Sequence, residues 1–264
     1  MDEAPLLVAQ RAGYRIVTLN RPQRLNAFNE AMLGALDAAL DEAVSDESCR
    51  ALILTGAGRG FCAGQDLADR VPQPGQRRDT GAGLDKIYNP LVRKLRALPF
   101  PVVAAVNGVA AGAGCNIALN CDIVLAARSA RFIQAFAKIG LIPDCGGTWL
   151  LPRLVGAARA RGLALLAEPL SAEQAESWGL IWKAVDDGVL LSEAEKLGAH
   201  FAQAPTAALA LAKRALDLAE TNTLDAQLDL ERDLQREAGR SPDYAEGVRA
   251  FMEKRKPVFG GRKA

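Results

Sequence analysis

Asp144 is the residue of this 264-residue chain whose type and setting best suit acid/base chemistry. It interrupts an otherwise apolar stretch, Ile139–Thr148 (IGLIPDCGGT), just before an expected helix. If its carboxyl faces an apolar pocket, burial raises the pKa toward a range that is useful for moving protons. The alternative, which the spacing alone favours, is a carboxylate that caps the following helix, an interaction worth roughly 1 kcal/mol.

Two glycine-rich segments offer backbone N–H groups for binding. Gly56–Asp66 (GAGRGFCAGQD) directly follows a predicted strand, and Val106–Asn120 (VNGVAAGAGCNIALN) lies between a strand and an apolar helix. Glycines let a ligand approach the backbone closely, and the first turn of a helix attracts anions. No Gly-Lys-Ser/Thr follows the first segment, so a Walker-type phosphate loop is a poor interpretation. The structural alternatives are a tight strand-to-helix turn, with Asp66 capping the next helix, and a small-residue helix packed in the core.

Taken together, the two segments favour a binding site. Each places its N–H groups at the carboxyl end of a predicted parallel strand, which is where α/β proteins bind ligands. Two such donors that converge on one point would hold an oxyanion. A thioester enolate needs this pair, because proton loss beside the carbonyl places negative charge on the carbonyl oxygen.

Composition excludes several other classes of protein. The formal net charge of +1 gives no field that would attract nucleic acid or an anionic membrane, and no apolar run is long enough to span a bilayer. The single histidine, His200, makes a Ser-His-Asp triad or a histidine-rich metal site improbable, and we interpret it as a surface or packing residue. The five cysteines form no CxxC pair and no secretory signal is present, so we expect reduced thiols and a cytoplasmic protein.

The first half of the chain alternates buried-strand and helical patterns, which predicts parallel strands joined by crossovers. The predicted strands are Tyr14–Asn20, Ala51–Gly56, Pro101–Val106 and Asp122–Ala126, and the helices begin at Asn29 and at Leu84. After Gly156 the pattern is mostly helical, with capping signals at Ser171 and Ser241 and one more strand expected over Leu180–Val185. The segment Val71–Gly83, rich in proline and glycine, is the best candidate for a mobile loop.

These motifs, in this order and spacing, resemble the enoyl-CoA hydratase/isomerase (crotonase) family over nearly the whole chain. The matching residues include Leu19–Pro22, Leu25–Ala27, Phe61–Asp66, Val106–Gly108 and Gly146–Thr148. The resemblance implies an α/β fold, a crotonase-like ββα spiral core over residues 1–198, followed by a helical trimerisation region over residues 199–264. It further implies a homotrimer or homohexamer that binds an acyl-CoA substrate and needs no metal or redox cofactor.

The resemblance also assigns roles to individual residues. The backbone N–H groups of Gln65 and Ala113 would form the oxyanion hole, and Asp144 would be the acid/base. Lys254, supplied by a neighbouring subunit, resembles the family's CoA phosphate contact, with a solvated helix face as the alternative. The remaining CoA contacts map to Arg24, Leu25, Ala27, Ala63, Gln65, Asp66 and Leu67.

The departures from the family pattern decide which reaction we expect. Family hydratases hold water with two glutamates, and this chain has Asn116 and Phe136 at those positions, while Asp144 stands where hydratases usually have glycine. A lone acid/base suits moving a proton within a substrate, so we expect an isomerase of an aryl- or alkenyl-acetyl-CoA. Asn116 would contact the substrate, orient Asp144 or serve as an ordinary polar helix residue. Tyr88–Val92 and Thr221–Arg232 resemble the family's isomerases of phenylacetate catabolism.

Four other functions stay open at this point. A Δ3-Δ2 enoyl-CoA isomerase of fatty-acid breakdown needs the same parts, and a hydratase-like protein of β-oxidation has the same fold. A dehalogenase of this fold would need aromatic contacts that cannot be placed here. A non-catalytic CoA-binding scaffold would explain the missing glutamates, although it has no need of an enolate site.

Overall fold

The computed structural model describes residues 4–68 and 79–262. Two sheets form the core, and both are mainly parallel. The larger sheet has the order β1 (Leu6–Arg11), β2 (Tyr14–Leu19), β3 (Leu52–Gly56), β5 (Val102–Val106), β7 (Ile123–Ala127) and β10 (Lys183–Val185). The smaller sheet has the order β4 (Gly60–Cys62), β6 (Val109–Ala111), β8 (Arg131–Ile133) and β9 (Leu170–Ser171).

Successive strands alternate between the two sheets, which makes the chain a spiral. β3, β5 and β7 are each followed after a short turn by β4, β6 and β8, one strand per sheet in every turn of the spiral. The central strands β3, β5 and β7 of the larger sheet are nearly continuous apolar runs because they are covered on both faces; every residue of β5 is buried, whereas the edge strand β1 is largely exposed. The predicted α/β spiral is therefore the observed architecture.

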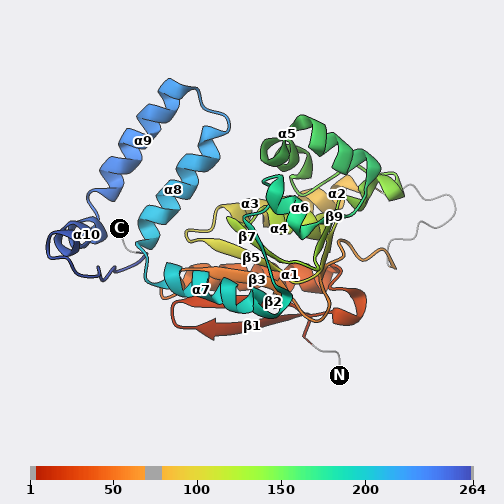
Figure 1. Ribbon diagram of the computed structural model, residues 1–264, viewed down its shortest axis with the longest axis horizontal. Helices are drawn as coiled ribbons and strands as arrows, with labels where there is room; N and C mark the ends of the chain where they lie inside the picture. Colours follow the sequence, from red (N-terminus) through yellow and green to blue (C-terminus); the bar gives the residue numbers. More distant parts are fainter. Residues whose placement is uncertain (1–3, 69–78, 263–264) are drawn as a thin grey trace.

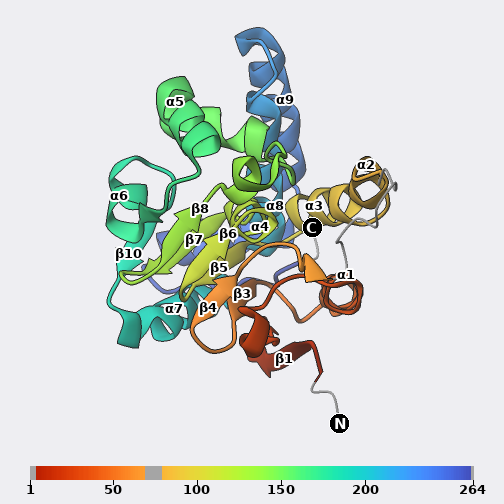
Figure 2. The same cartoon turned by 90° about the vertical axis from the view of Figure 1, so that its right-hand side faces the viewer.

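Helices separate the turns of the spiral and cover the sheets. They are α1 (Glu30–Ser45), α2 (Gly81–Gly83), the π-helical segment η3 (Leu84–Tyr88), α3 (Asn89–Arg96), α4 (Ala113–Leu119), α5 (Gly147–Leu166), α6 (Ala172–Ser177) and α7 (Leu190–Ala202), with short 3-10 turns η1 (Pro22–Arg24), η4 (Ala135–Ile139) and η5 (Asp187–Val189). Figure 2 shows α4 near the centre, with α1 and α3 on one side and α6 on the other. α7 runs across the larger sheet and contacts β2, β3, β5 and β7.

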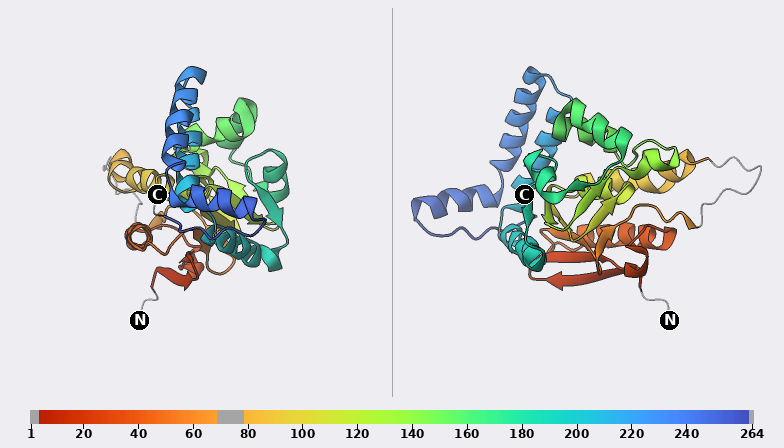
Figure 3. Two further views of the ribbon diagram at one scale, coloured as in Figure 1. Left: turned by 90° about the vertical axis from the view of Figure 1, so that its left-hand side faces the viewer. Right: turned by 45° about the vertical axis from the view of Figure 1, so that its right-hand side comes forward.

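The last three helices form an arm that projects from the core. α8 (Thr206–Ala219) and α9 (Leu224–Ala238) pack against each other, and α10 (Pro242–Met252) lies at the far end, as Figures 1 and 3 show. Lys213 fastens α8 to the core, because its ammonium lies 2.8 Å from the Asp122 carboxylate at the start of β7 and donates to the carbonyls of Leu98 and Phe100. The proposed boundary at residue 198 falls within α7 and stays a prediction.

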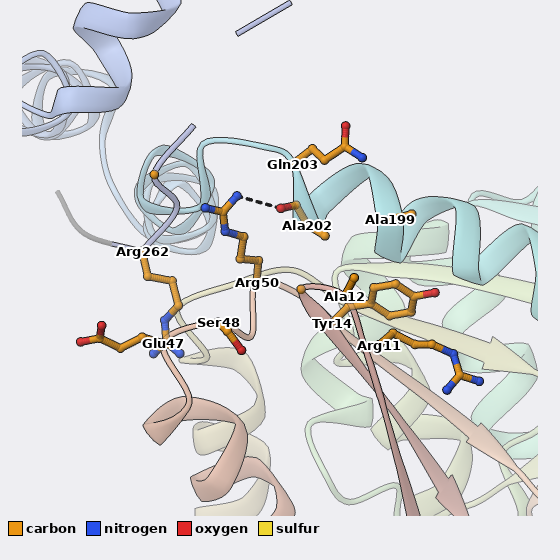
Figure 4. A pocket seen from close by; sticks show the side chains of 12 residues that line it. Arg11, Ala12, Tyr14, Glu47, Ser48, Arg50, Ala199, Ala202, Gln203 and Arg262 are labelled. Carbon is orange, nitrogen blue, oxygen red and sulfur yellow. Dashed lines mark hydrogen bonds between the residues drawn. The ribbon is translucent and has the colours of Figure 1, made fainter. Parts of the chain in front are cut away.

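A cavity of about 900 Å³ lies between the β1–β2 turn, the end of α7 and the chain after α10 (Figure 4). Its arginines serve the fold. Arg50 donates to the carbonyls of Ala202 and Phe259 at 2.7 and 2.8 Å, and Arg262 donates to the carbonyls of Val44 and Asp46. These bonds attach the C-terminal segment to the core. The cavity therefore lies at the junction between the arm and the spiral.

Most predicted elements are confirmed, and the differences have local causes. The caps at Asn29, Ser171 and Ser241 each accept a hydrogen bond from the backbone of the first helical turn. The predicted strand Leu180–Val185 begins only at Lys183, because Leu180 and Gly179 close the preceding helix with bonds to α6. The predicted mobile loop lies mainly outside the described residues, and its last three residues are helical. His200 is exposed, as expected.

Candidate active site

The two glycine-rich segments meet where β4 and β6 lead into the centre of the spiral. Gly56–Asp66 is a strand–turn–strand, not the strand-to-helix turn that the sequence also allowed, since β4 follows β3 directly. Asn26 fixes this turn by donating to the carbonyls of Ala57 and Gly60 at 2.9 and 2.7 Å. The second segment ends in α4, whose seven residues are all buried. It is thus both a packed core helix and a helix whose N-terminus reaches the first loop.

Gly64 is the point of contact between the two segments. Its φ of +92° is left-handed, and a Cβ at this position would lie 2.8 Å from the Ala111 carbonyl oxygen and 3.6 Å from the Ala113 nitrogen. Gln65 therefore follows a residue that touches the start of α4. Ala113 is the first residue of α4, so its N–H has no acceptor inside the helix. The oxyanion-hole role of the Gln65 and Ala113 N–H groups is consistent with this contact and stays a prediction.

The two segments expected to contact CoA also lie side by side. The Ala63 N–H donates to Leu25 O at 2.9 Å, and Phe28 N–H donates to Gly64 O at 2.7 Å. Leu25 has a left-handed backbone, which turns the chain sharply after the exposed Arg24. The remaining members of the predicted set, Ala27, Asp66 and Leu67, lie on the same two segments.

Asp66 has a structural partner in this arrangement. Its carboxylate lies 2.9 Å from the Arg21 guanidinium and accepts from the Ala68 N–H at 3.1 Å, and these bonds hold its pKa below the ordinary range. Arg21 also donates to Ala27 O, so it joins the two segments. The carboxylate closes a short turn at Ala68, which begins a 3-10 turn. The alternative in which Asp66 caps the next helix stays a prediction, because the chain after Ala68 lies outside the described residues.

Asp144 does not cap the helix that follows it. α5 begins at Gly147, the capping position is Gly146, and no side chain caps it; the Gly147 N–H bonds to the Asp144 main-chain carbonyl at 2.8 Å. The carboxyl is largely buried, and its Oδ1 has no hydrogen-bond partner in the described part of the chain. Burial raises the pKa of Asp144 above its ordinary value, while a contact with the Cys145 thiol opposes the rise. An unpaired carboxyl with a raised pKa suits proton transfer.

Two amides of α4 hold the segment that carries Asp144. Asn116 donates from Nδ2 to the Asp144 carbonyl at 2.8 Å, and Asn120, one turn later, donates to the Cys145 carbonyl at 2.9 Å. A Cβ at Gly147 would collide with the Asn116 amide, so only glycine allows this approach. Of the roles considered for Asn116, orienting Asp144 is the one that its hydrogen bonds support, and it acts through the main chain.

Comparisons with known proteins agree with this geometry. The enoyl-CoA hydratase/isomerase family profile matches residues 10–262. The chain is 60% identical over 251 residues to the 1,2-epoxyphenylacetyl-CoA isomerase of Escherichia coli, covering 95% of this chain and 96% of that one. It is 51% identical to a probable enoyl-CoA hydratase of Rhodobacter capsulatus, with 95% of each chain covered. A crystal structure of enoyl-CoA hydratase from Bacillus anthracis superposes with a TM-score of 0.91 at 32% identity, covering 97% of this chain and 99% of that one.

The chain belongs to the enoyl-CoA hydratase/isomerase family. The crotonase-like fold expected from the sequence is confirmed, and so is the prediction of an enzyme of this family; the first of the three relatives above is an isomerase. Among the described residues, no helix is both long and apolar enough to cross a membrane.

Within this family, the two positions expected to lack the hydratase glutamates are both buried. Asn116 donates to the Asp144 main-chain carbonyl, as described above. Phe136 lies on η4, 6% exposed, and its ring tip would lie 3.7 Å from a Cβ placed on Gly112, the residue before α4. Phe136 therefore presents a hydrocarbon wall beside the helix start.

One residue of the predicted site, Lys254, lies apart from the others. Lys254 is exposed and follows α10 at the far end of the arm, so a single chain does not bring it to the other residues (Figure 1). Its role toward a neighbouring subunit stays a prediction. The sequence reasoning missed Gln134, because a buried amide beside the Asn116 position gave no signal in the sequence. Arg21 and Asn26 lie in segments that matched the family, but their contacts with the Gly56–Asp66 segment were not predicted.

Proposed function

We propose that this enzyme is an isomerase of CoA thioesters that converts 2-(1,2-epoxy-1,2-dihydrophenyl)acetyl-CoA to oxepin-CoA in aerobic phenylacetate degradation. The observation that carries the proposal is the Asp144 carboxyl, which caps no helix and has an Oδ1 without a partner among the described residues, on a main chain that Asn116 of α4 holds. The 60% identity to a relative of that name supports the substrate.

In the proposed reaction, the main-chain N–H groups of Gln65 and Ala113 donate to the thioester carbonyl oxygen. Asp144 takes a proton from the carbon beside that carbonyl, and the oxygen carries the resulting negative charge. The same carboxyl returns a proton while the epoxide opens and the ring expands, so the substrate and the product have the same atoms. CoA is part of the substrate, and this scheme uses no other cofactor.

The polar groups of the site favour proton transfer over hydration. Adding water across a double bond calls for groups that hold and activate the water, and Phe136 and Asn116 supply neither a base nor an acid. The ring of Phe136 also keeps the wall beside Gly112 apolar. These features support an isomerase in preference to the hydratase named for the relative at 51% identity.

The decisive experiment compares the wild-type enzyme with Asp144→Asn. The variant keeps the shape of the side chain and loses the exchangeable carboxyl proton, so we expect turnover of the epoxide thioester to fall by about 10²- to 10⁴-fold. Binding of the unreactive thioester phenylacetyl-CoA, measured by calorimetry, is expected to stay within about threefold, because the N–H donors are unchanged. Turnover near the wild-type rate would remove Asp144 from the mechanism.

A Δ3-Δ2 enoyl-CoA isomerase is the second candidate, because moving a double bond also requires one acid/base and one oxyanion hole. Rates with 3-enoyl-CoA and with the epoxide thioester, measured on the same preparation, separate the two. A higher kcat/KM for 3-enoyl-CoA would replace the first proposal by the second.

We also propose that the arm joins chains into a trimer or a dimer of trimers. A groove of about 720 Å³ on the arm is lined largely by apolar side chains, among them Tyr244, Val248 and Phe251. Phe251 is 82% exposed and Met252 is 75% exposed, which is costly for a surface that faces only water. A neighbouring subunit would cover these side chains and would also carry Lys254 to the site proposed for it.

A further inference from the structure

We propose that Gln134 is a positioning residue for the Asp144 carboxyl and that it acts through Asn116. This inference rests on the proposed acid/base role of Asp144 and adds a residue outside the set that the sequence suggested. Gln134 lies between β8 of the smaller sheet and η4, whereas Asn116 lies on α4 and Asp144 on the segment before α5.

Three groups form a chain of hydrogen bonds with a fixed direction. The Asp144 main-chain carbonyl can only accept, so the Asn116 group that faces it at 2.8 Å is the Nδ2 donor. The other end of that amide, Oδ1, must then accept, and Gln134 Nε2 donates to it at 2.8 Å. The orientation of both amides therefore follows from one backbone carbonyl. Gln134 sets the plane of the Asn116 amide, and that plane sets the Asp144 peptide.

The surroundings of Gln134 indicate that its Nε2 donor, and not its Oε1 acceptor, is the group that positions Asn116. The residue is 2% exposed, and its Nε2 is used twice, toward Asn116 Oδ1 and toward the Cys115 sulfur at 3.4 Å. Its Oε1 is buried and has no partner among the described residues. Buried amides normally satisfy both ends. A flipped amide would place Oε1 against Asn116 Oδ1, two acceptors facing each other, so the observed orientation preserves the bond to Asn116 while Oε1 goes unpaired.

A change at Gln134 should affect the Asp144 side chain, because hydrogen bonds fix the Asp144 peptide whereas the carboxyl Oδ1 has no partner among the described residues. The Asp144 carbonyl receives the Asn116 and Gly147 donors, and the next carbonyl, that of Cys145, receives Asn120. Cys145 also has a left-handed backbone, which leaves the segment little freedom. The direction of the Asp144 carboxyl is therefore set mainly by main-chain bonds, beside its contact with the Cys145 thiol. Loss of the Gln134 donor frees the Asn116 amide to rotate and the segment to move toward solvent.

The test compares Gln134→Leu and Gln134→Met with a matched control. The leucine variant removes both amide ends, and the methionine variant keeps the length of the side chain but has no N–H donor. The control is Asn222→Leu, since Asn222 donates to Gln227 Oε1 at 2.9 Å and Gln227 Nε2 donates to the Ala215 carbonyl at 3.1 Å, the same amide–amide–carbonyl arrangement at the α8–α9 turn. We expect the control to keep wild-type turnover.

For both Gln134 variants we expect kcat to fall at least about tenfold, with KM within about threefold. We also expect the acidic limb of the kcat profile to move to lower pH, because a carboxylate that gains water ionises more easily. The thiols near Asp144 do not contribute to the acidic limb of the kcat profile. Burial raises the pKa of Cys145, and it raises the pKa of Cys62 to about 12, so both stay protonated over the range of the assay.

Two results would overturn the inference. One is a kcat within about threefold of wild type in the methionine variant; the other is a lower kcat with an unmoved acidic limb, which marks a purely structural loss. A carboxyl ¹³C NMR titration of Asp144, assigned by its absence in Asp144→Asn, gives the same comparison without substrate. If the wild-type enzyme turns over neither thioester, the proposed function fails, and this titration still decides whether Gln134 positions Asp144.

Discussion

Asparagine at position 144 is expected to stabilise the folded protein at neutral pH while it abolishes turnover. The Asp144 carboxyl is largely buried, its Oδ1 has no hydrogen-bond partner among the described residues, and burial raises its pKa. An unpaired buried acceptor costs about 1–3 kcal/mol, and a charge on it costs more. Because the carboxyl keeps some contact with solvent, we take the low end for the variant, a gain of about 1 kcal/mol in the free energy of unfolding. For a chain of this size that raises the melting temperature by about 2–4 °C.

The pH dependence gives the sharper form of this prediction. A raised pKa in the folded state means that the folded protein binds the proton more tightly than the unfolded chain does, whose Asp pKa is about 3.9. Below that value both states are neutral at this position, and the wild-type protein and the variant differ little. As the pH rises through the raised folded pKa, the wild-type protein loses stability relative to Asp144→Asn, and above it the difference stays constant.

Melting temperatures from calorimetry at equal subunit concentration, taken from about pH 4 to about pH 8, measure the difference. Asp66→Asn is the control with the opposite sign. The Ala68 N–H and the Arg21 guanidinium hold the pKa of Asp66 below its ordinary range, so that carboxylate stabilises the fold at neutral pH and its replacement should lower the melting temperature. An Asp144→Asn protein that is no more stable than wild type at about pH 8, or a gain that does not change with pH, would refute the reasoning.

Two further predictions concern the thiols and the arm. All five cysteines are buried, and burial raises the pKa of both Cys62 and Cys115 to about 12. Mass spectrometry after iodoacetamide treatment should therefore find the native protein unmodified and the denatured protein alkylated. Labelling of Cys62 in the native protein would contradict this prediction. Phe251→Asp on the arm should shift the protein toward the monomer in sedimentation equilibrium. Leu7→Asp on β1, a residue that is also exposed, should leave the assembly unchanged. A wild-type protein that sediments as a monomer would contradict the assembly proposal.

The parts of the fold that the sequence predicts are those set by local patterns. The buried strands β2, β3, β5 and β7 and the capped helix α1 follow from apolar runs and from an asparagine at the right position. The smaller sheet gave no comparable signal, since β4, β6 and β8 have only three residues each and β9 has two. Strands that short are defined by their neighbours in the sheet. The spiral came from the family resemblance and not from periodicity.

The candidate site divides in the same way. Glycine-rich turns after strands mark the two binding segments, because a turn and a helix start are local features. The choice of Gln65 and Ala113 within them came from the family resemblance. The role of Asp144 could not be read from its spacing, which favoured a helix cap. The cap fails for a reason that lies in another segment: Asn116 and the Gly147 N–H take the Asp144 carbonyl, and the turn at Cys145 and Gly146 carries the side chain away from the start of α5. Contacts between α4 and this segment are absent from any local pattern.

This arrangement explains how a reactive carboxyl can be both fixed and unpaired. Any side chain that oriented the Asp144 carboxyl by a charged or strong hydrogen bond would also lower its pKa and weaken it as a base, as Arg21 and Ala68 do for Asp66. Here the bonds that fix the position end on the carbonyl oxygens of residues 144 and 145, supplied by Asn116, Asn120 and the Gly147 N–H. The main chain is satisfied, and burial alone sets the direction of the carboxyl's pKa shift. A site built this way separates orientation from basicity, so changes in the amides of α4 and in Gln134 should alter turnover without supplying or removing a charge.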